Sequence, residues 1–165
     1  MKKLINIIIT IIFVYLISAC AGYKPLYTTN LQFEIKDYSL KTNKELGKKI
    51  YSKIRNLSKK NESENNSNIK KIAIIIDANK NKSATAKDST GKILGHKIII
   101  NGSIQVSDYV TKNKILNYNF SESSIYIIQS KYSETIKLEN KNIENLINKI
   151  YKNILIKMSE NMTEK

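Results

Sequence analysis

The stretch that decides the fold is ILGHKIIINGSIQVSDYVTKNKILNYNFSESSIYII, residues 93–128. Its first part, 93–110, predicts one long strand, because apolar and polar residues alternate there as they do on the two faces of a half-buried sheet. One face of this strand carries Ile98, Ile100, Ile104 and Val106, and the other carries Ser103, Gln105 and Ser107. Residues 111–114 predict a turn and 115–128 predict a partner strand, so the whole stretch is expected to form an antiparallel hairpin.

Upstream of the hairpin, the sequence predicts another strand, followed by a helix. Residues 31–40 alternate between apolar and polar and predict the strand. Thr42 and Glu45 fit a capping box, in which the threonine hydroxyl caps the start of a helix and the glutamate reaches back to it. The helix is expected at 45–59, and its apolar stripe consists of Leu46, Ile50, Ile54 and Leu57. The polar stretch 59–68 predicts a solvated loop.

The remaining elements complete the fold class. The β-branched run 72–76 predicts a strand that is covered on both faces, and 83–87 fits a further short strand before a turn at 88–91. Residues 138–160 predict an amphipathic helix, with an apolar stripe of Ile143, Leu146, Ile147, Ile150, Ile154 and Met158. The order β-α-β-β-β-α indicates an α+β domain, with two helices packed on one face of a mainly antiparallel four-stranded sheet.

The first nineteen residues predict an export signal. Lys2 and Lys3 give a short basic start, and residues 4–17 are apolar apart from Asn6 and Thr10. As a helix, this apolar run spans only about 21 Å, which is short of the roughly 30 Å hydrocarbon core of a bilayer. It therefore predicts the core of a signal peptide rather than a permanent membrane span.

The signal ends in a sequence that predicts lipidation. Ile17-Ser18-Ala19-Cys20 resembles the bacterial lipobox, which implies cleavage between Ala19 and Cys20 and acyl chains on Cys20. Several acyl chains form a stable anchor where a single chain is marginal. Cys20 is the only cysteine in the sequence and forms no internal disulfide; the alternative is an ordinary thiol. Ala21 follows, not the aspartate that retains lipoproteins in the inner membrane of many enteric bacteria. The expected location is therefore the periplasmic side of the outer membrane.

The charge is strongly positive. Twenty-eight basic and fourteen acidic residues give a formal net charge of +14, and removal of the signal peptide with its two lysines leaves 14 − 2 = +12. Such a charge indicates either an anionic partner or a solvated, lysine-rich surface. The bias towards Ile, Lys and Asn also fits an AT-rich genome, so both interpretations stay open.

The sequence contains no recognisable set of catalytic residues. His96 is the only histidine, and no cysteine or carboxylate cluster lies near it in sequence. It therefore predicts a satisfied or exposed structural histidine rather than a ligand or base. Gly91 and Gly95 match no phosphate-binding loop. We expect no enzymatic activity, no metal and no cofactor other than the covalent lipid. Nucleic acid would suit the charge, but the export signal argues against it.

The residues after Cys20 carry a family resemblance. Gly22, Tyr23, Pro25, Leu26 and Tyr27 resemble the mature start of the LPS-assembly lipoproteins of the LptE type, especially the alphaproteobacterial ones. The order of elements, the Asp-x-x-Gly turn at 88–91 and Ser-Lys-Tyr-Ser at 130–133 before the last helix extend this resemblance along the mature chain. The departures are lysine where the family often has arginine, and the added polar stretch at 59–68. Because Pro25 fixes an extended backbone and its neighbours can pack, we expect this tether to lie against the domain or a barrel wall; the alternative is a local hydrophobic staple.

The resemblance implies a function and a domain organisation. Proteins of this family plug the LptD-type β-barrel of the outer membrane, support its assembly and help to insert lipopolysaccharide into the outer leaflet. The organisation expected here is a signal peptide (1–19), a lipidated tether (20–30), a single α+β domain (31–160) and a tail (161–165). We expect lipopolysaccharide contacts from four lysines that the hairpin turns bring together, Lys92, Lys97, Lys112 and Lys114. The alternative is a structural or peptidoglycan-associated outer-membrane lipoprotein without a barrel partner.

Overall fold

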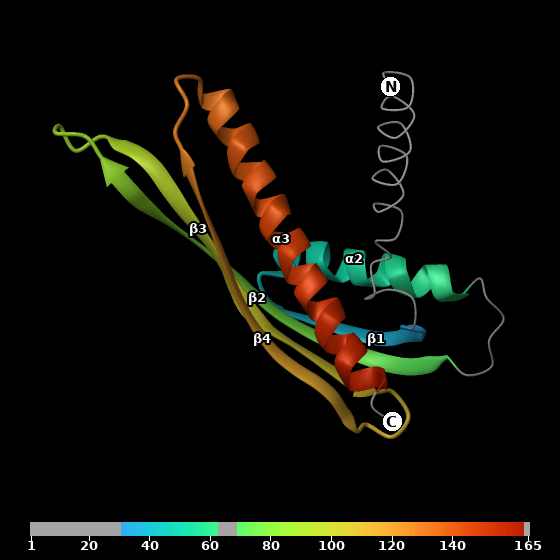
Figure 1. Cartoon of the computed structure of the whole chain (residues 1–165). Coiled ribbons are helices and arrows are strands. Elements are labelled where there is room, and N and C mark those ends of the chain that lie inside the picture. The colour runs from blue at the N-terminus through green and yellow to red at the C-terminus, as the bar shows by residue number, and fades with distance from the viewer. Residues whose placement is uncertain (1–30, 63–68, 164–165) are drawn as a thin grey trace, which may run out of the picture.

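The computed structural model describes residues 31–62 and 69–163 of the 165-residue chain. Their elements are β1 (Phe33–Thr42), α2 (Lys44–Glu62), β2 (Lys70–Lys87), β3 (Ile93–Asp108), β4 (Lys114–Ile127) and α3 (Tyr132–Thr163) (Figure 1). This is the order that the sequence predicts. The expected signal peptide, Cys20 and the tether motif lie outside the described residues.

The described strands form one sheet in the order β1-β2-β3-β4. β1 and β2 are parallel, because α2 carries the chain back along the sheet between them, as parallel neighbours require. Short turns join β2 to β3 and β3 to β4, and these pairs are antiparallel. The predicted α+β fold with a mainly antiparallel sheet is confirmed, and the parallel β1–β2 pair makes the sheet mixed.

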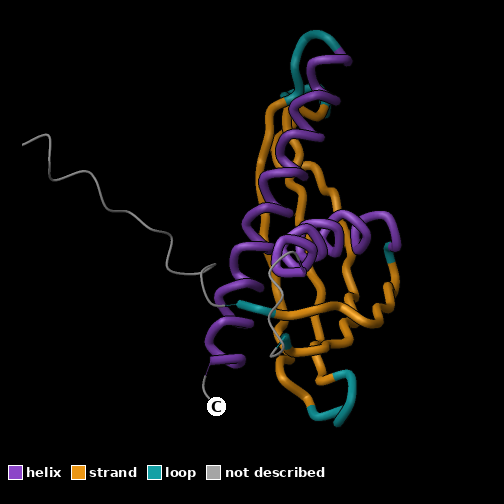
Figure 2. The backbone as a smooth tube through the Cα atoms, turned by 90° about the vertical axis from the view of Figure 1, so that its right-hand side faces the viewer, coloured by secondary structure: helices purple, strands orange, loops and turns teal. Residues whose placement is uncertain are grey.

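Both helices pack on the same face of the sheet. α2 lies over β1 and β2, whereas α3 runs along β4 and also contacts β3 and α2 (Figures 1 and 2). The predicted apolar stripes meet between these layers, and the most completely buried side chains are Phe33, Ile50, Ile54, Ile72, Ile74, Ile76, Ile98, Ile100, Ile104, Ile147, Ile150 and Ile154. Burial of each such side chain contributes about 1.5–3 kcal/mol, so this face holds the fold together.

β2 is longer than the sequence indicates. The segments 72–76 and 83–87 belong to one 18-residue strand, because β3 pairs with both of them. β1 ends at Thr42, opposite Ala78, so β2 becomes an edge strand from Asn79 onward. Lysines and short polar side chains fill that edge, which discourages pairing with another chain.

Both helices also extend beyond their predicted ends. α2 continues to Glu62, three residues beyond its predicted end at 59, and α3 begins at Tyr132 rather than at 138. α3 runs to Thr163 and thus includes the start of the predicted tail. These added turns contain no glycine or proline, so nothing in their sequence stops the helix.

The helix cap of α2 is Asn43 and not Thr42. The Asn43 side-chain oxygen accepts the backbone N–H of Leu46 at 3.0 Å. Thr42 instead remains in β1 with a φ of 54°, and its hydroxyl donates to the Asp77 carboxylate on β2. Threonine and asparagine are both good caps, so the pattern placed the cap one residue too early.

The sheet face opposite the helices has no covering element among the described residues. Ala73 and Ile75 are half-buried there, so the prediction that the 72–76 strand is covered on both faces is wrong. A β-branched run indicates a strand but does not report what lies above each face. We call this surface the open face; it is dominated by amides and hydroxyls, which include Asn101, Ser103, Gln105, Asn117, Asn119, Ser121 and Ser123.

Candidate interaction surfaces

The four lysines expected to contact lipopolysaccharide do not form one cluster. Lys92 and Lys97 lie at the β2–β3 end of the sheet, whereas Lys112 and Lys114 lie at the β3–β4 end. A strand rises about 3.3 Å per residue, so the part of β3 from Lys97 to Asp108 alone spans about 35 Å. The prediction that the turns bring them together is wrong, because consecutive turns of antiparallel strands lie at opposite ends of the sheet (Figure 1).

The β2–β3 end projects beyond β1 and α2 (Figure 1). We define the distal arm as residues 79–101, which include the β2–β3 turn, together with residues 121–127. On the open face of this arm, Ile125 and Ile127 are 63% and 66% exposed. Lys97 pairs directly with Ile125 across the β3–β4 ladder. The arm thus offers a cation beside exposed aliphatic side chains, a combination that suits an amphiphilic ligand.

A rigid turn presents Lys92 at the tip of this arm. The Asp88 carboxylate accepts the backbone N–H of Thr90 at 2.9 Å and that of Lys92 at 3.0 Å, and Gly91 has a φ of 87°. The hydrogen bond from the Thr90 hydroxyl, together with those from the backbone N–H groups, lowers the pKa of Asp88 and outweighs the opposing effect of desolvation. The carboxylate therefore stays ionised and holds the predicted 88–91 turn closed.

A three-residue cluster, which we call the Glu139 clamp, fastens α3 to the distal arm. Lys82 on β2 donates to the Glu139 carboxylate at 2.6 Å, and the Tyr126 hydroxyl on β4 donates to the same oxygen at 2.6 Å. Burial would raise the pKa of Glu139, but the hydrogen bonds from Lys82 and Tyr126 outweigh it and lower the pKa. The hydrogen bond to Glu139 likewise raises the pKa of Lys82. Sequence reasoning missed this cluster, because only strand pairing and helix packing bring its members together.

His96 lies next to the clamp and is half-buried. Its ring centroid is 5.7 Å from that of Tyr126, and its Nδ1 is buried with no hydrogen-bond partner among the described residues. The expectation of a satisfied or exposed histidine is therefore wrong, because the β3–β4 pairing places the ring under α3. Within 31–62 and 69–163, no group of three or more histidine, cysteine or carboxylate side chains is placed to hold a metal ion.

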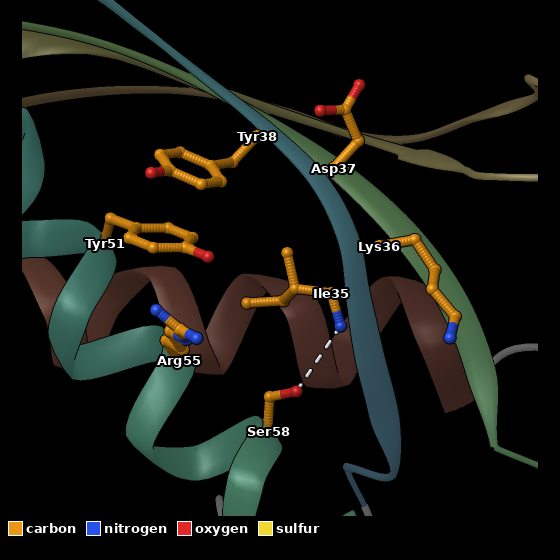
Figure 3. Close-up of a pocket in the computed structure, with 7 residues that line it drawn as sticks. All are labelled: Ile35, Lys36, Asp37, Tyr38, Tyr51, Arg55 and Ser58. Atoms are coloured by element: carbon orange, nitrogen blue, oxygen red, sulfur yellow. Dashed lines mark hydrogen bonds between the residues drawn. The ribbon is translucent and has the colours of Figure 1, made fainter.

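A hollow of about 270 Å³ lies between β1 and α2 (Figure 3). The rings of Tyr38 and Tyr51 stack along it with centroids 4.0 Å apart, and the Arg55 guanidinium lies beside them (Figure 3). The Ser58 hydroxyl accepts the Ile35 N–H at 3.4 Å and donates to the Phe33 carbonyl at 3.2 Å.

These contacts pack β1 against α2, and the one charged group that we consider further in the hollow is the guanidinium of Arg55. Burial raises the pKa of Tyr51, and the nearby Arg55 only partly offsets this effect, so the phenol stays neutral. Arg55 forms no ion pair within the described part of the chain. A guanidinium beside an aromatic stack can hold a planar anion, but the hollow contains no nucleophile with an adjacent base.

The described helices include none that is long and apolar enough to cross a membrane.

Known proteins resemble this chain in structure but not in sequence. No family model and no curated protein sequence matches this chain. The structure is similar to that of a minor lipoprotein from Acinetobacter baumannii, at 15% identity and a TM-score of 0.51, over 79% of this chain and 95% of that one. It is similar to lipoprotein B from Nitrosomonas europaea, at 12% identity and a TM-score of 0.56, over 81% and 87% of the two chains.

A third similar structure is that of a protein described as a lipoprotein from Caulobacter crescentus. It is 9% identical, with a TM-score of 0.55, over 76% of this chain and 88% of that one. At such low identities the similarity shows a shared fold. The fold of this chain is thus one that several proteins described as bacterial lipoproteins also have.

Proposed function

We propose that this chain is a lipoprotein anchored through Cys20 to the periplasmic side of the outer membrane, where it plugs an LptD-type β-barrel and assists the insertion of lipopolysaccharide into the outer leaflet. The lipobox-like sequence that ends at Cys20 and the tether motif of residues 22–27 support the anchor and the family. The fold adds support, because proteins described as lipoproteins share it. In this proposal the chain acts by binding and not by catalysis.

The proposal that this chain plugs a barrel rests on the composition of the open face. The interior of an outer-membrane barrel is polar, so a plug needs a surface that can exchange hydrogen bonds with it. The open face runs the length of β3 and β4 and presents mostly neutral amides and hydroxyls, such as Asn101, Asn119 and Ser121. Each of these side chains can donate and accept, without the cost of burying a charge.

The distal arm suits the lipopolysaccharide part of the proposal. Lys92 and Lys97 would meet phosphates or carboxylates as point charges, and Ile125 and Ile127 would meet acyl chains. These four residues lie at one end of the sheet. Lys112 and Lys114 lie at the other end and would have to act separately.

A pull-down of the tagged, lipidated protein in mild detergent tests the barrel partner. We expect a large β-barrel to co-purify in stoichiometric amount, and Cys20→Ala to abolish acylation of the protein. The double variant Asn119→Arg, Ser121→Arg should lower barrel recovery, because it places two charges on the open face. Asn145→Arg, on the exposed side of α3, is the matched control and should leave recovery unchanged. Recovery of the lipoprotein alone would overturn the plug and favour a structural lipoprotein.

Lipopolysaccharide binding by the purified complex tests the arm separately. Lys92→Gln with Lys97→Gln should weaken binding by about thirtyfold, given roughly 1 kcal/mol per lysine near an anionic lipid surface. The same pair of substitutions at Lys112 and Lys114 is the control. An equal loss from both pairs would contradict a role specific to the arm.

A further inference from the structure

The end of the molecule opposite the distal arm has features that the barrel proposal does not use. We call it the proximal end: the β3–β4 turn, residues 109–113, with Lys70, Lys71 and Lys114 on the flanking strands. At this turn Val110 is 73% exposed and Tyr109 is 39% exposed, although both are large apolar side chains. Exposure of two neighbouring apolar side chains to water is unfavourable, and an exposed apolar patch with a polar rim is typical of a binding surface.

The backbone holds Val110 in this exposed position. The Asp108 carboxylate accepts the N–H of Val110 at 2.9 Å and that of Thr111 at 2.8 Å. The Tyr109 N–H donates to the Lys71 carbonyl at 2.9 Å, and Lys112 takes a φ of 60° to close the turn. The apolar tip is therefore a fixed feature of the turn and not a fraying loop.

Lysines surround this apolar tip. The ammonium group of Lys112 lies 4.5 Å from the centre of the Tyr109 ring. Lys70 and Lys114 line a hollow of about 350 Å³ next to the turn, together with Asp108, Thr111, Asn113, Ile115 and Asn161. Within the described residues, none of the lysines at positions 70, 71, 112 and 114 forms an ion pair.

The local charge is accordingly positive. Asp108 is the acidic residue of the turn itself, and the two nearest glutamates along the flanking elements already have lysine partners. Glu34 pairs with Lys36, and Glu160 pairs with Lys157 at 2.7 Å. Among the residues that the structure describes here, four cations face one unpaired carboxylate, and such a surface attracts anions.

The chain from the expected anchor enters the domain at this same end. β1 begins at Phe33, which pairs with Lys70, and the next residue of β2, Lys71, bonds to Tyr109. Leu31 follows Cys20 by eleven positions, so the entry point lies at most about 40 Å from the lipid. An anchored protein thus keeps its proximal end within reach of the bilayer that holds its acyl chains.

We propose that the proximal end is a membrane-contact surface that binds anionic phospholipid headgroups. The lysines and the hollow beside them take the headgroup phosphates, while Val110 and Tyr109 enter the boundary between headgroups and acyl chains. Tyrosine favours this boundary because it has an apolar body and a polar tip, and lysine stems can lie along apolar surface with the charge in water. The inference rests on the lipid anchor of the proposed function, and it adds an orientation in which the distal arm points away from the anchoring leaflet.

Vesicle binding by the unlipidated mature chain tests this inference. The protein is residues 20–165 with Cys20→Ala, which retains every described residue and the whole buried core. Co-sedimentation is measured with phosphatidylcholine vesicles that do or do not contain phosphatidylglycerol. We expect binding only to the anionic vesicles, with a loss at high salt.

Matched variants identify the surface that binds. Lys112→Gln with Lys114→Gln should weaken vesicle binding by about thirtyfold, given roughly 1 kcal/mol per lysine, and Val110→Ser should weaken it by several-fold. The controls are Lys92→Gln with Lys97→Gln and Ile127→Ser, which remove matching lysines and an exposed aliphatic side chain from the distal arm and should weaken binding much less. All of these positions lie outside the buried core, and circular dichroism confirms that each variant folds.

Two results would overturn the inference: equal binding to both kinds of vesicle, or a loss from the distal variants that equals or exceeds the loss from the proximal ones. The vesicles contain neither barrel nor lipopolysaccharide. A failure here with barrel recovery intact would therefore reject the membrane-contact surface alone, whereas loss of the barrel in the pull-down would reject the proposed function.

Discussion

The Glu139 clamp gives a prediction whose size follows from the structure. Glu139→Gln keeps a side-chain oxygen for the Tyr126 hydroxyl but removes the charge that pairs with Lys82 at 2.6 Å. A hydrogen bond to a charged group is worth about 1.5–3 kcal/mol, but the Lys82 side chain is 37% exposed and water screens the pair. We expect the variant to lose about 1 kcal/mol of unfolding free energy at pH 7, or roughly 3–5 °C in Tm.

The loss should depend on pH with a definite sign. The pKa of Glu139 lies below its ordinary value of 4.5 in the folded protein, so its contribution is present above that value and is lost as the pH falls through the folded pKa. The difference in unfolding free energy between wild type and variant should therefore shrink below about pH 4.5.

Urea unfolding at pH 7 and at pH 3 measures this difference. Glu134→Gln is the control, because its pair with Lys131 is longer, at 3.6 Å, and largely exposed. The control should change stability by less than about 0.5 kcal/mol at either pH. The clamp would be refuted if Glu139→Gln lowered the free energy of unfolding equally at both values of pH. It would also be refuted if the control variant lowered that free energy as much as Glu139→Gln does.

Three further substitutions test the fold. Gly102→Ala should lower the free energy of unfolding by about 3 kcal/mol, because a Cβ there would collide with the Asp77 carbonyl on β2. A Tm within about 1–2 °C of the wild-type value would contradict this close approach. Ile150→Ala, at a fully buried position on α3, should cost about 3 kcal/mol in urea unfolding, and a cost below about 1 kcal/mol would argue against the packing of α3. Asn43→Ala should cost about 1 kcal/mol and Asn43→Ser much less, since only alanine removes the cap on the Leu46 N–H; equal costs would exclude the cap.

The sequence predicted the elements that are held together by regular apolar spacing. Alternation placed Ile98, Ile100, Ile104 and Val106 on the buried face of β3, and the stripe from Ile143 to Met158 fixed the buried side of α3. These predictions succeeded because the residues on a buried face recur at every second position in a strand and about every 3.6 positions in a helix.

Features that depend on pairing between distant segments were not predictable in this way. The second half of β2 has no apolar alternation, and only its ladder with β3 makes it a strand. The same pairing places the lysines at 92 and 112 at opposite ends, and it brings Lys82 and Tyr126 to Glu139. The sequence contained each of these residues but not the distances between them.

The central claim is that the open face of this protein lies against the wall of a large outer-membrane barrel. Photo-crosslinking in intact cells tests it most directly, with a photoreactive amino acid placed at Ser121 on the open face or at Asn145 on the exposed side of α3. We expect an adduct with the barrel when the photoreactive amino acid is at Ser121, and little or none when it is at Asn145. Absence of a barrel adduct at Ser121, with the protein present in the outer membrane, would contradict it.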